Sequence, residues 1–159
     1  MQELTGKTTS AADKNFAIVV SNYYENITHK LLEGAVKTLV AAGVAESNLV
    51  TLWTPGSWEL PAATLRVLKS GKFDAVVILG CVIKGETTHD QHINTAISNG
   101  IAQLTLEYDV PIGFGLLTCN TLQQALDRSG GSVGNKGVEA AEAAVHMSQV
   151  FTELASLND

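Results

Sequence analysis

Short apolar runs alternate along this chain with longer segments in which apolar residues recur every three or four positions. The apolar runs lie at residues 16–21, 49–53, 74–83 and 112–118. Nearly continuous runs of this kind are typical of parallel strands that are covered by helices on both faces. After the first run, Ile27, Leu31 and Ala35 recur at helical spacing. The alternation predicts an α/β, three-layer sandwich with a doubly wound, four-stranded parallel sheet in the middle.

Turn and capping residues set the predicted helix ends in the first half of the chain. Gly43 is a good stop for the first helix, because glycine tolerates the left-handed conformation found after many helix C-termini. Ser57 is the predicted cap of the second helix, and Pro61 fits only within the first turn of that helix. The second helix is expected to end near Gly71.

The second half of the chain is predicted to hold three helices. A long helix spans about 90–107. Thr121 with Gln124 forms a capping-box pattern, which predicts the start of a short helix. Residues 130–135, with the sequence GGSVGN, are predicted to form a loop, and the last helix starts near residue 136.

Length and composition bound the fold and its partners. The 159 residues suit one domain with a substantial core, which we place at 15–159 after an arm over 1–14 that is too polar to join the core. Charged residues make up only 16%, below the usual rough quarter, so we expect part of the surface to be buried in a homo-oligomer. The net charge of −6 argues against nucleic acid and anionic membranes as main partners.

The chain shows features expected of a cytoplasmic protein. The first fourteen residues are polar and lack the apolar core of a secretory signal, and no apolar run approaches the length of a membrane span. Cys81 and Cys119 are too few for a disulfide framework. We therefore expect both thiols to be reduced and the protein to be cytoplasmic.

The loop after the third apolar run carries the strongest chemical signal. In doubly wound folds the site lies beyond the carboxyl ends of the strands, which is where residues 84–89 stand. Free amides and the dipole at a helix start favour an anion, and Gly85 permits close approach of the backbone. His89 can transfer protons near neutral pH. The plainer alternatives are a helix-capping turn, with Thr87 or Thr88 as the cap, and a surface histidine.

Aromatic and charged residues near the other strand ends add to this candidate site. Tyr23 and Trp58 can stack on a flat ring, and Glu59 can accept hydrogen bonds from an amine or a polyol. Arg128 offers a fork of donors suited to phosphate, and Lys136 stands at a helix start, where a cation is locally unfavourable. The structural alternatives are core or strand-end aromatics, a glutamate favoured by a helix dipole, and an arginine that neutralises a helix C-terminus.

A metal site is the main rival from a different class. His89 and His92 can share a helix face, while Cys81 and Cys119 end neighbouring strands, so the four could bind zinc. No pair of them has a recognised metal-ligand spacing, and the cysteines can equally be small buried hydrophobic residues. A third class is non-enzymatic and includes a flavodoxin-like flavin binder or a shell-forming structural protein.

Four longer motifs occur in the order PGSWELP, ILGCVIKGETTH, VPIGFGLLT and QALDRSGGSVGNKGVEAAEAA. Together they resemble the lumazine synthase family of riboflavin biosynthesis in order and spacing, and they cover essentially the whole chain. The resemblance implies a flavodoxin-like strand order. It also implies condensation of 5-amino-6-(D-ribitylamino)uracil with 3,4-dihydroxy-2-butanone 4-phosphate to 6,7-dimethyl-8-ribityllumazine, with release of phosphate and water and without cofactor or metal.

The same resemblance implies roles for individual residues. His89 would move protons, and Phe114 and Lys136 would come from a neighbouring subunit. The pyrimidine and its ribityl chain would be bound by Tyr23, Gly56, Ser57, Trp58, Glu59, Val82 and Ile83. In the loop, Lys84, Gly85, Glu86 and Thr87 would bind substrate, with the amides from Gly85 to Thr87 holding the phosphate together with Arg128.

Three places depart from the family pattern. The stacking aromatic, usually Phe or Trp, is Tyr23, and the next residue, usually Asn, is Tyr24. After the histidine the family has an aromatic and then an acid, whereas Asp90 and Gln91 follow here. We expect Asp90 to take over the orientation of His89.

The resemblance also implies an assembly. The N-terminal arm would add a strand to a neighbouring subunit's sheet, and the subunits would form pentamers. Members that remain pentamers often carry extra residues in the loop between the last two helices, whereas the spacing from Arg128 to Lys136 shows no insertion. We therefore expect twelve pentamers to form a sixty-subunit icosahedral shell, with riboflavin synthase as a candidate partner.

Overall fold

Four parallel strands form the central sheet of the computed structural model, which describes residues 1–7 and 9–158. The strands are β1 (Phe16–Ser21), β2 (Leu49–Thr54), β3 (Ala75–Ile83) and β4 (Ile112–Cys119). They lie in the order β2-β1-β3-β4, and each neighbouring pair is parallel. The predicted sheet is confirmed nearly at its predicted bounds. Thr8 of the predicted arm and Asp159 of the predicted domain lie outside the described residues.

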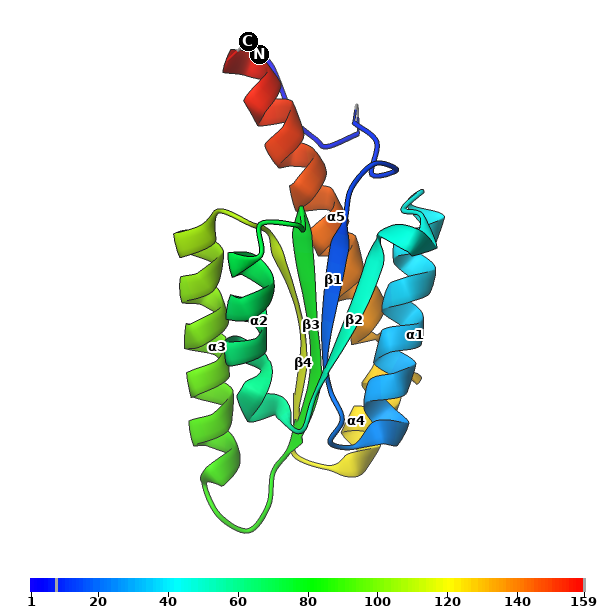
Figure 1. Cartoon of the computed structure of the whole chain (residues 1–159). Helices are drawn as coiled ribbons and strands as arrows, with labels where there is room; N and C mark the ends of the chain where they lie inside the picture. The colour runs from blue at the N-terminus through cyan, green and yellow to red at the C-terminus, as the bar shows by residue number, and fades with distance from the viewer. Residues whose placement is uncertain (8, 159) are drawn as a thin grey trace.

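Helices cover both faces of this sheet (Figure 1), which confirms the predicted three layers. One layer holds α2 (Leu60–Lys69) and α3 (His89–Tyr108), and the other holds α1 (Glu25–Ala41), α4 (Leu122–Arg128) and α5 (Lys136–Ala155). Three short 3-10 helices complete the elements: η1 (Glu46–Asn48), η2 (Ser57–Glu59) and η3 (Ser156–Asn158). None of the helices within the described residues has the length and apolar character needed to cross a membrane.

The two central strands, β1 and β3, carry the core. All six residues of β1 are buried. Phe16, Ile18 and Val20 pack in the cluster that contains α1 and α5 residues, whereas Ala17 and Val19 pack with residues of α2 and α3. Because both faces of the sheet are covered, apolar residues need not alternate with polar ones along the strand. This explains the continuous apolar runs in the sequence.

Glycines allow α5 to pack very closely against its neighbours. A Cβ atom on Gly113 of β4 would stand 2.0 Å from the carbonyl oxygen of Ala140. A Cβ atom on Gly137 would likewise stand 2.0 Å from the carbonyl oxygen of Leu31 in α1. Backbone atoms occupy both places, so a side chain there would force α5 away from the sheet or from α1.

The segment predicted as a loop at 130–135 is largely a small hairpin, so that prediction is wrong. The antiparallel strands β5 (Ser129–Gly131) and β6 (Gly134–Asn135) pair within it. Gly130 and Gly134 adopt φ angles of 110° and 92°, which let so short a segment turn and pair. Composition predicts a loop here because glycine is generally unfavourable in strands.

Ser57 does not cap α2, contrary to the prediction. It begins η2, and α2 starts only at Leu60, with Pro61 in the first turn as expected. The intervening 3-10 turn separates the Ser57 hydroxyl from the first amides of α2. By contrast, the predicted cap of α4 is confirmed, because Thr121 Oγ1 accepts a hydrogen bond from the Gln124 amide at 3.2 Å.

The N-terminal arm lies beside α5 of the same chain, and the two chain ends are close together (Figure 1). Glu153 Oε2 accepts hydrogen bonds from the amides of Thr5 and Gly6, both at 2.9 Å. Ala11 is completely buried in the core, although the polarity of the arm predicts otherwise. Small residues in a polar segment can thus reach the core where larger polar ones cannot.

Candidate active site

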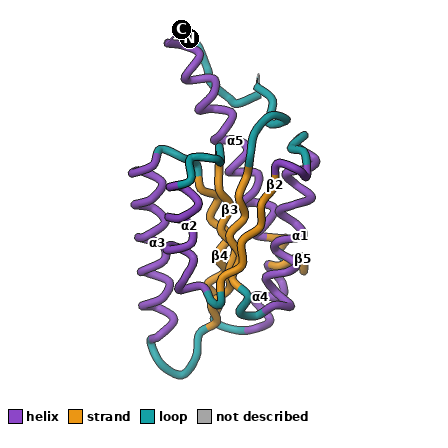
Figure 2. Tube along the Cα trace, in the orientation of Figure 1, coloured by secondary structure: helices purple, strands orange, loops and turns teal. Residues whose placement is uncertain are grey.

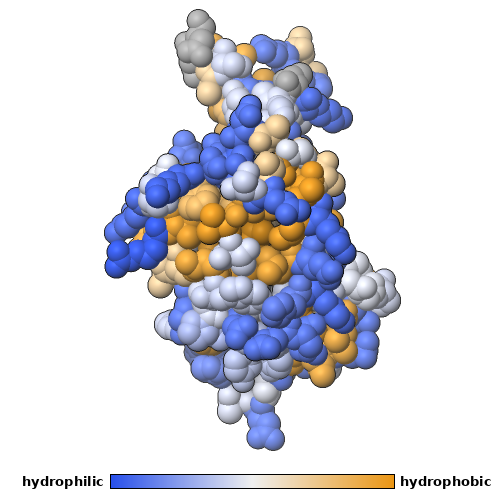
Figure 3. Space-filling model, turned by 45° about the vertical axis from the view of Figure 1, so that its right-hand side comes forward, coloured by the Kyte–Doolittle hydropathy of each residue, from blue (hydrophilic) through white to orange (hydrophobic). Residues whose placement is uncertain are grey.

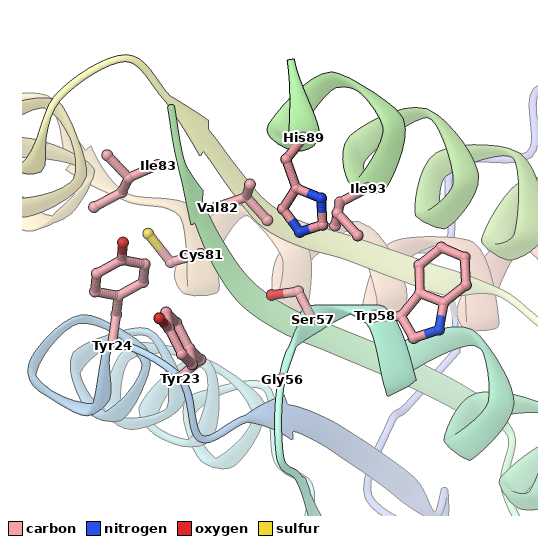
Figure 4. A pocket seen from close by; sticks show the side chains of 10 residues that line it. All are labelled: Tyr23, Tyr24, Gly56, Ser57, Trp58, Cys81, Val82, Ile83, His89 and Ile93. Atoms are coloured by element: carbon pink, nitrogen blue, oxygen red, sulfur yellow. The ribbon is translucent and has the colours of Figure 1, made fainter. Parts of the chain in front are cut away.

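A pocket of about 340 Å³ opens at the carboxyl ends of the central strands (Figure 4). Its walls come from the turn after β1, the turn after β2, the end of β3 and the start of α3. The lining residues are Tyr23, Tyr24, Gly56, Ser57, Trp58, Cys81, Val82, Ile83, His89 and Ile93. The pocket lies where the strand order reverses between β1 and β3, as expected for a doubly wound sheet.

The residues predicted to bind the ring and ribityl chain line this pocket, with Glu59 as the exception, and His89 joins them. Glu59 lies directly beside it, since a Cβ atom on Gly56 would stand 3.2 Å from Glu59 Oε2. The structure therefore brings the predicted ring-binding residues and the predicted proton-transfer residue to one hollow. Segments widely separated in sequence meet there because parallel strands end at the same edge of the sheet.

Three lining residues were not predicted to bind the substrates: Tyr24, Cys81 and Ile93. Helical spacing could have indicated Ile93, which stands one turn after His89 on the same helix face. Strand alternation could have indicated Cys81, which shares a face of β3 with Ile83. No sequence signal indicates that Tyr24 turns its side chain toward the pocket, because that depends on its backbone conformation.

Ser57 supplies an unpaired hydroxyl to the pocket. The residue is 7% exposed, and its Oγ has no hydrogen-bond partner within the described residues. In Figure 4 this oxygen points into the hollow between His89 and Tyr23. A buried hydroxyl without a partner is costly, so its persistence here is consistent with pairing to a ligand.

Tyr23 and Tyr24 form an edge-to-face pair at one end of the pocket. Their ring centroids lie 4.8 Å apart, and the ring planes are inclined at 89°. Burial raises the pKa of the Tyr24 hydroxyl, and the neighbouring Tyr23 and Cys81 raise it further. Tyr24 therefore remains a neutral phenol with its ring against Tyr23.

The loop that joins β3 to α3 (Figure 2) is the predicted anion site. It presents free backbone donors. The Lys84 amide is anchored to the Cys119 carbonyl at 2.8 Å. Within the described residues, the amides of Gly85, Glu86 and Thr87 donate no hydrogen bond, and all three residues are exposed. These donors precede the N-terminus of the twenty-residue helix α3, whose dipole favours an anion at this place.

The capping alternative for this loop is only weakly supported. Thr87 Oγ1 accepts a long hydrogen bond of 3.4 Å from the His89 amide. Thr88 occupies the N-cap position of α3 but makes no side-chain capping bond. A turn built only to cap the helix would place a side-chain acceptor closer to these amides.

Arg128 lies close to the base of the same loop. Burial raises the pKa of the Cys119 thiol, and the nearby Arg128 guanidinium partly opposes that rise. Cys119 is also the residue whose carbonyl anchors Lys84. Arg128 Nη1 donates to the Gln124 carbonyl at 3.2 Å, which leaves its other donors available. Cationic donors and free amides therefore share one end of the site.

The zinc alternative does not fit the arrangement of its proposed ligands. Among residues 1–7 and 9–158, no group of three or more His, Cys, Asp or Glu side chains could hold a metal ion. Cys81 and Cys119 are buried free thiols, and burial together with Cys119 raises the pKa of Cys81 to about 12. A protonated, buried thiol is a poor metal ligand. His89 and His92 thus lack the third ligand that zinc requires.

Besides Glu59, seven predicted residues do not line the pocket. Five of them are Lys84 to Thr87 and Arg128, described above, and the other two, Phe114 and Lys136, were expected to come from a neighbouring subunit. Phe114 is on β4, which forms an edge of the sheet, and it is 38% exposed. Lys136 starts α5, where its ammonium group pairs with the Glu139 carboxylate. Neither residue lines the pocket described above.

Asp90 does not orient His89 in this chain, so it does not take over the part expected of the family's acid. Its Oδ1 is buried and has no hydrogen-bond partner among the described residues, and the same is true of Asn94 Oδ1 one helical turn later. Both side chains continue the inward-facing row of α3 that includes Ile97. The Asp90 side chain therefore lies on the face of α3 that packs toward the sheet, and not beside the imidazole.

Comparison with known proteins agrees with the geometry of the site. A family model described as 6,7-dimethyl-8-ribityllumazine synthase matches residues 13–152. A protein of that name from Phocaeicola vulgatus is 46% identical over 138 residues, covering 87% of this chain and 82% of the relative. Another from Rhodopirellula baltica is 42% identical over 154 residues, covering 97% of this chain and 99% of the relative. The chain therefore belongs to the 6,7-dimethyl-8-ribityllumazine synthase family and is an enzyme of riboflavin biosynthesis.

Proposed function

We propose that the pocket of Figure 4 is the site at which 5-amino-6-(D-ribitylamino)uracil condenses with 3,4-dihydroxy-2-butanone 4-phosphate. The observation that carries this proposal is the convergence of a stacking ring, an unpaired hydroxyl and an imidazole on one hollow, from Tyr23, Ser57 and His89. The free amides of the β3–α3 loop and Arg128 lie at one end. Ring recognition and anion recognition are thus adjacent, as a reaction between these two substrates requires.

The pyrimidine would stack on Tyr23 and meet the backbone groups of Val82 and Ile83. Its ribityl chain, which is rich in hydroxyl groups, would extend toward Ser57, Trp58 and Glu59, where an unpaired hydroxyl and a carboxylate are available. These contacts orient the ring amine toward the anion end of the site. Holding two substrates in reacting geometry supplies much of the catalysis in such a condensation.

The phosphate group would be bound by the amides of Gly85, Glu86 and Thr87 and by Arg128, with Lys84 adding positive charge. The ring amine attacks the butanone carbonyl, and water leaves to form an imine. Elimination from the imine then releases inorganic phosphate and leaves an enol, which tautomerises to a carbonyl. Attack of the second amine on this carbonyl closes the ring with loss of a second water. His89 stands at the pocket wall, where it would move the protons of these steps. No step requires a redox cofactor or a metal.

A second copy of the chain would complete the site with Phe114 and Lys136. Both lie outside the pocket of their own chain, on an exposed part of β4 and at the start of α5. The low charge content of the surface fits such burial between copies. We propose a pentamer as the smallest active unit.

The β2 edge of the sheet would receive the arm of a neighbouring copy. Val50, Leu52 and Trp53 on this strand are 48%, 38% and 40% exposed. Figure 3, in which this side is turned forward, shows a wide apolar area. An edge strand with open hydrogen-bonding groups and exposed apolar side chains is suited to strand addition. Exchange of arms would require the arm to leave its own Glu153.

Assembly into a sixty-subunit shell, with riboflavin synthase as a partner, extends this proposal. Light scattering and electron microscopy of the purified protein test it. Particles of shell size are expected, whereas free pentamers alone would contradict the shell and monomers would contradict the shared site. The compartment that we propose is the cytoplasm, where the free thiols of Cys81 and Cys119 remain reduced.

Absorbance and fluorescence of the product, followed after mixing both substrates, test the catalytic proposal. The protein-free mixture is the control, because the condensation proceeds slowly unaided. Product formation well above this background, and unchanged by a chelator, is expected. A tightly bound yellow chromophore without acceleration would instead favour a flavin-binding protein.

A further inference from the structure

The turn from β1 into α1 holds a tyrosine in an unusual backbone conformation. Tyr24 has φ 58° and ψ 56°, in the left-handed region. Within residues 1–7 and 9–158, Asp109 is the only other non-glycine residue with positive φ. Left-handed conformations suit glycine, asparagine and aspartate, whereas bulky residues adopt them rarely. The backbone at this position therefore does not explain why the residue is a tyrosine.

Helix capping does not explain it either. Tyr24 is the N-cap residue of α1, and its carbonyl accepts hydrogen bonds from the amides of Ile27 at 2.8 Å and Thr28 at 3.0 Å. Its side chain makes no capping hydrogen bond. Any residue could provide the carbonyl, and asparagine would add a side-chain acceptor. The reason for a tyrosine must lie in its ring.

That ring contacts Tyr23, an exposed aromatic side chain at the pocket. Tyr23 is 61% exposed, and its ring meets Tyr24 edge-to-face at 4.8 Å, an arrangement that aromatic pairs prefer. Figure 4 shows Tyr24 at the end of the pocket beside Cys81, with Tyr23 between it and Gly56. An exposed ring that is already held in place loses less freedom when a ligand stacks on it.

We propose that Tyr24 is a positioning residue, whose ring holds Tyr23 ready to stack on the flat pyrimidine and closes the pocket beside Cys81. The proposal rests on the stacking role proposed for Tyr23. Tyr24 acts through Tyr23, whose proposed partner is the pyrimidine and not the phosphate. It should therefore affect binding of the pyrimidine and leave the phosphorylated butanone and the proton transfers of His89 unchanged.

Two substitutions separate the ring from the backbone. Tyr24→Asn removes the ring but tolerates the left-handed conformation, and Tyr24→Phe keeps the ring and removes only the hydroxyl. Calorimetric titration of the assembled protein with the pyrimidine substrate should show roughly three- to tenfold weaker binding for Tyr24→Asn. Tyr24→Phe should stay within about twofold of the wild type, because the edge-to-face contact remains. The thermal unfolding midpoint of Tyr24→Asn should change little, since relief of the backbone offsets the loss of the ring's packing against the core.

Steady-state kinetics provide the second readout. The KM for the pyrimidine should rise in Tyr24→Asn by a similar factor, with kcat and the KM for the butanone phosphate unchanged. Unaltered pyrimidine binding in Tyr24→Asn, equal losses in both variants, or an equal rise in both KM values would overturn the positioning role. Wild-type protein that binds the pyrimidine without accelerating the condensation would overturn the catalytic proposal alone, because the titration needs no turnover.

Discussion

In a single chain, the central sheet is well buried, whereas the pocket at its carboxyl edge keeps exposed and unpaired groups. β1 is buried at all six positions and β3 at its first seven. At the pocket, the buried Ser57 Oγ lacks a partner among the described residues, and Tyr23 is largely exposed. Apolar burial stabilises the sheet without help, whereas unpaired polar groups indicate a place that a ligand or second copy will occupy. One chain forms the fold, whereas the site that we propose is completed by its ligands and by a second copy.

A Gly→Ala substitution should lower stability in the sheet and leave it nearly unchanged in the pocket loop. Gly113→Ala places a Cβ atom 2.0 Å from the Ala140 carbonyl oxygen, so β4 and α5 must separate. We expect a loss of about 3 kcal/mol in the free energy of unfolding, seen as a fall of roughly 10 °C in the thermal midpoint. Gly85→Ala is the matched control in the pocket loop, where an added Cβ would meet no atom within 4 Å. Equal midpoints for the two variants would remove the distinction between the regions.

Removing the guanidinium at the anion end should have the largest effect on activity. Arg128→Ala should lower kcat/KM for the butanone phosphate roughly a hundredfold, because hydrogen bonds to charged groups are among the strong ones. Pyrimidine binding and thermal stability should change little. Steady-state kinetics with each substrate varied in turn check this, with Arg66→Ala on the exposed face of α2 as the control. A loss shared equally by both substrates would contradict a phosphate role.

Removing the imidazole should have a smaller effect. His89→Ala should lower kcat roughly tenfold, less than the ~10²–10⁴-fold usual for general acid–base catalysis, because positioning contributes most of the rate. The assembled state should be unchanged, as light scattering can show. His92→Ala, one turn away and outside the pocket, is the control. A normal kcat in His89→Ala would exclude the proton-transfer role.

The smallest effect is expected from a thiol reagent added to the native protein. Both cysteines are buried, although Cys81 lines the pocket. Burial and Cys119 raise the pKa of Cys81 to about 12, so its thiol stays protonated near neutral pH. A thiol-specific reagent at about pH 8 should label neither cysteine in the native protein and both after denaturation. Rapid native labelling would show that this end of the pocket is open.

The raised pKa of Cys81 also makes the stability of the fold depend on pH. The pKa of Cys81 is higher in the folded chain than in the unfolded one, so deprotonation favours unfolding. The contribution of this group is unaffected below the ordinary thiol pKa of about 8.5 and declines as pH rises from there toward about 12. The difference in thermal midpoint between the wild type and Cys81→Ala should stay constant toward neutral pH, and above about pH 8.5 the midpoint of the wild type should fall relative to that of the variant.

The predicted and observed folds agree where local pattern and tertiary environment require the same residues. The four strands were predictable because a sheet covered on both faces needs uninterrupted apolar runs. The hairpin of β5 and β6 was not, because it depends on positive φ angles at Gly130 and Gly134, which the sequence permits but does not require. Ser57 failed as a cap for a related reason, since an added 3-10 turn displaced it from α2.

For the site, the loop from Lys84 to His89 and the ring-binding residues were predictable from motifs at strand ends. Their convergence on one pocket was a consequence of topology, which places those ends at one edge. Asp90 could not be assigned correctly, because helical phase turns it beneath α3. Tyr24 stands in a segment at a strand end and departs from the family pattern, but no role was predicted for it.

The sequence by itself determined the layered α/β fold, the family and most of the residues that line the pocket, because apolar periodicity and side-chain chemistry are local properties. Only the tertiary structure decided which side chains meet in the pocket and which polar atoms remain unpaired. It also decided that the ring of Tyr24 turns onto Tyr23. These features depend on backbone angles and on contacts between distant segments, which become defined only when the sheet and its helices have packed.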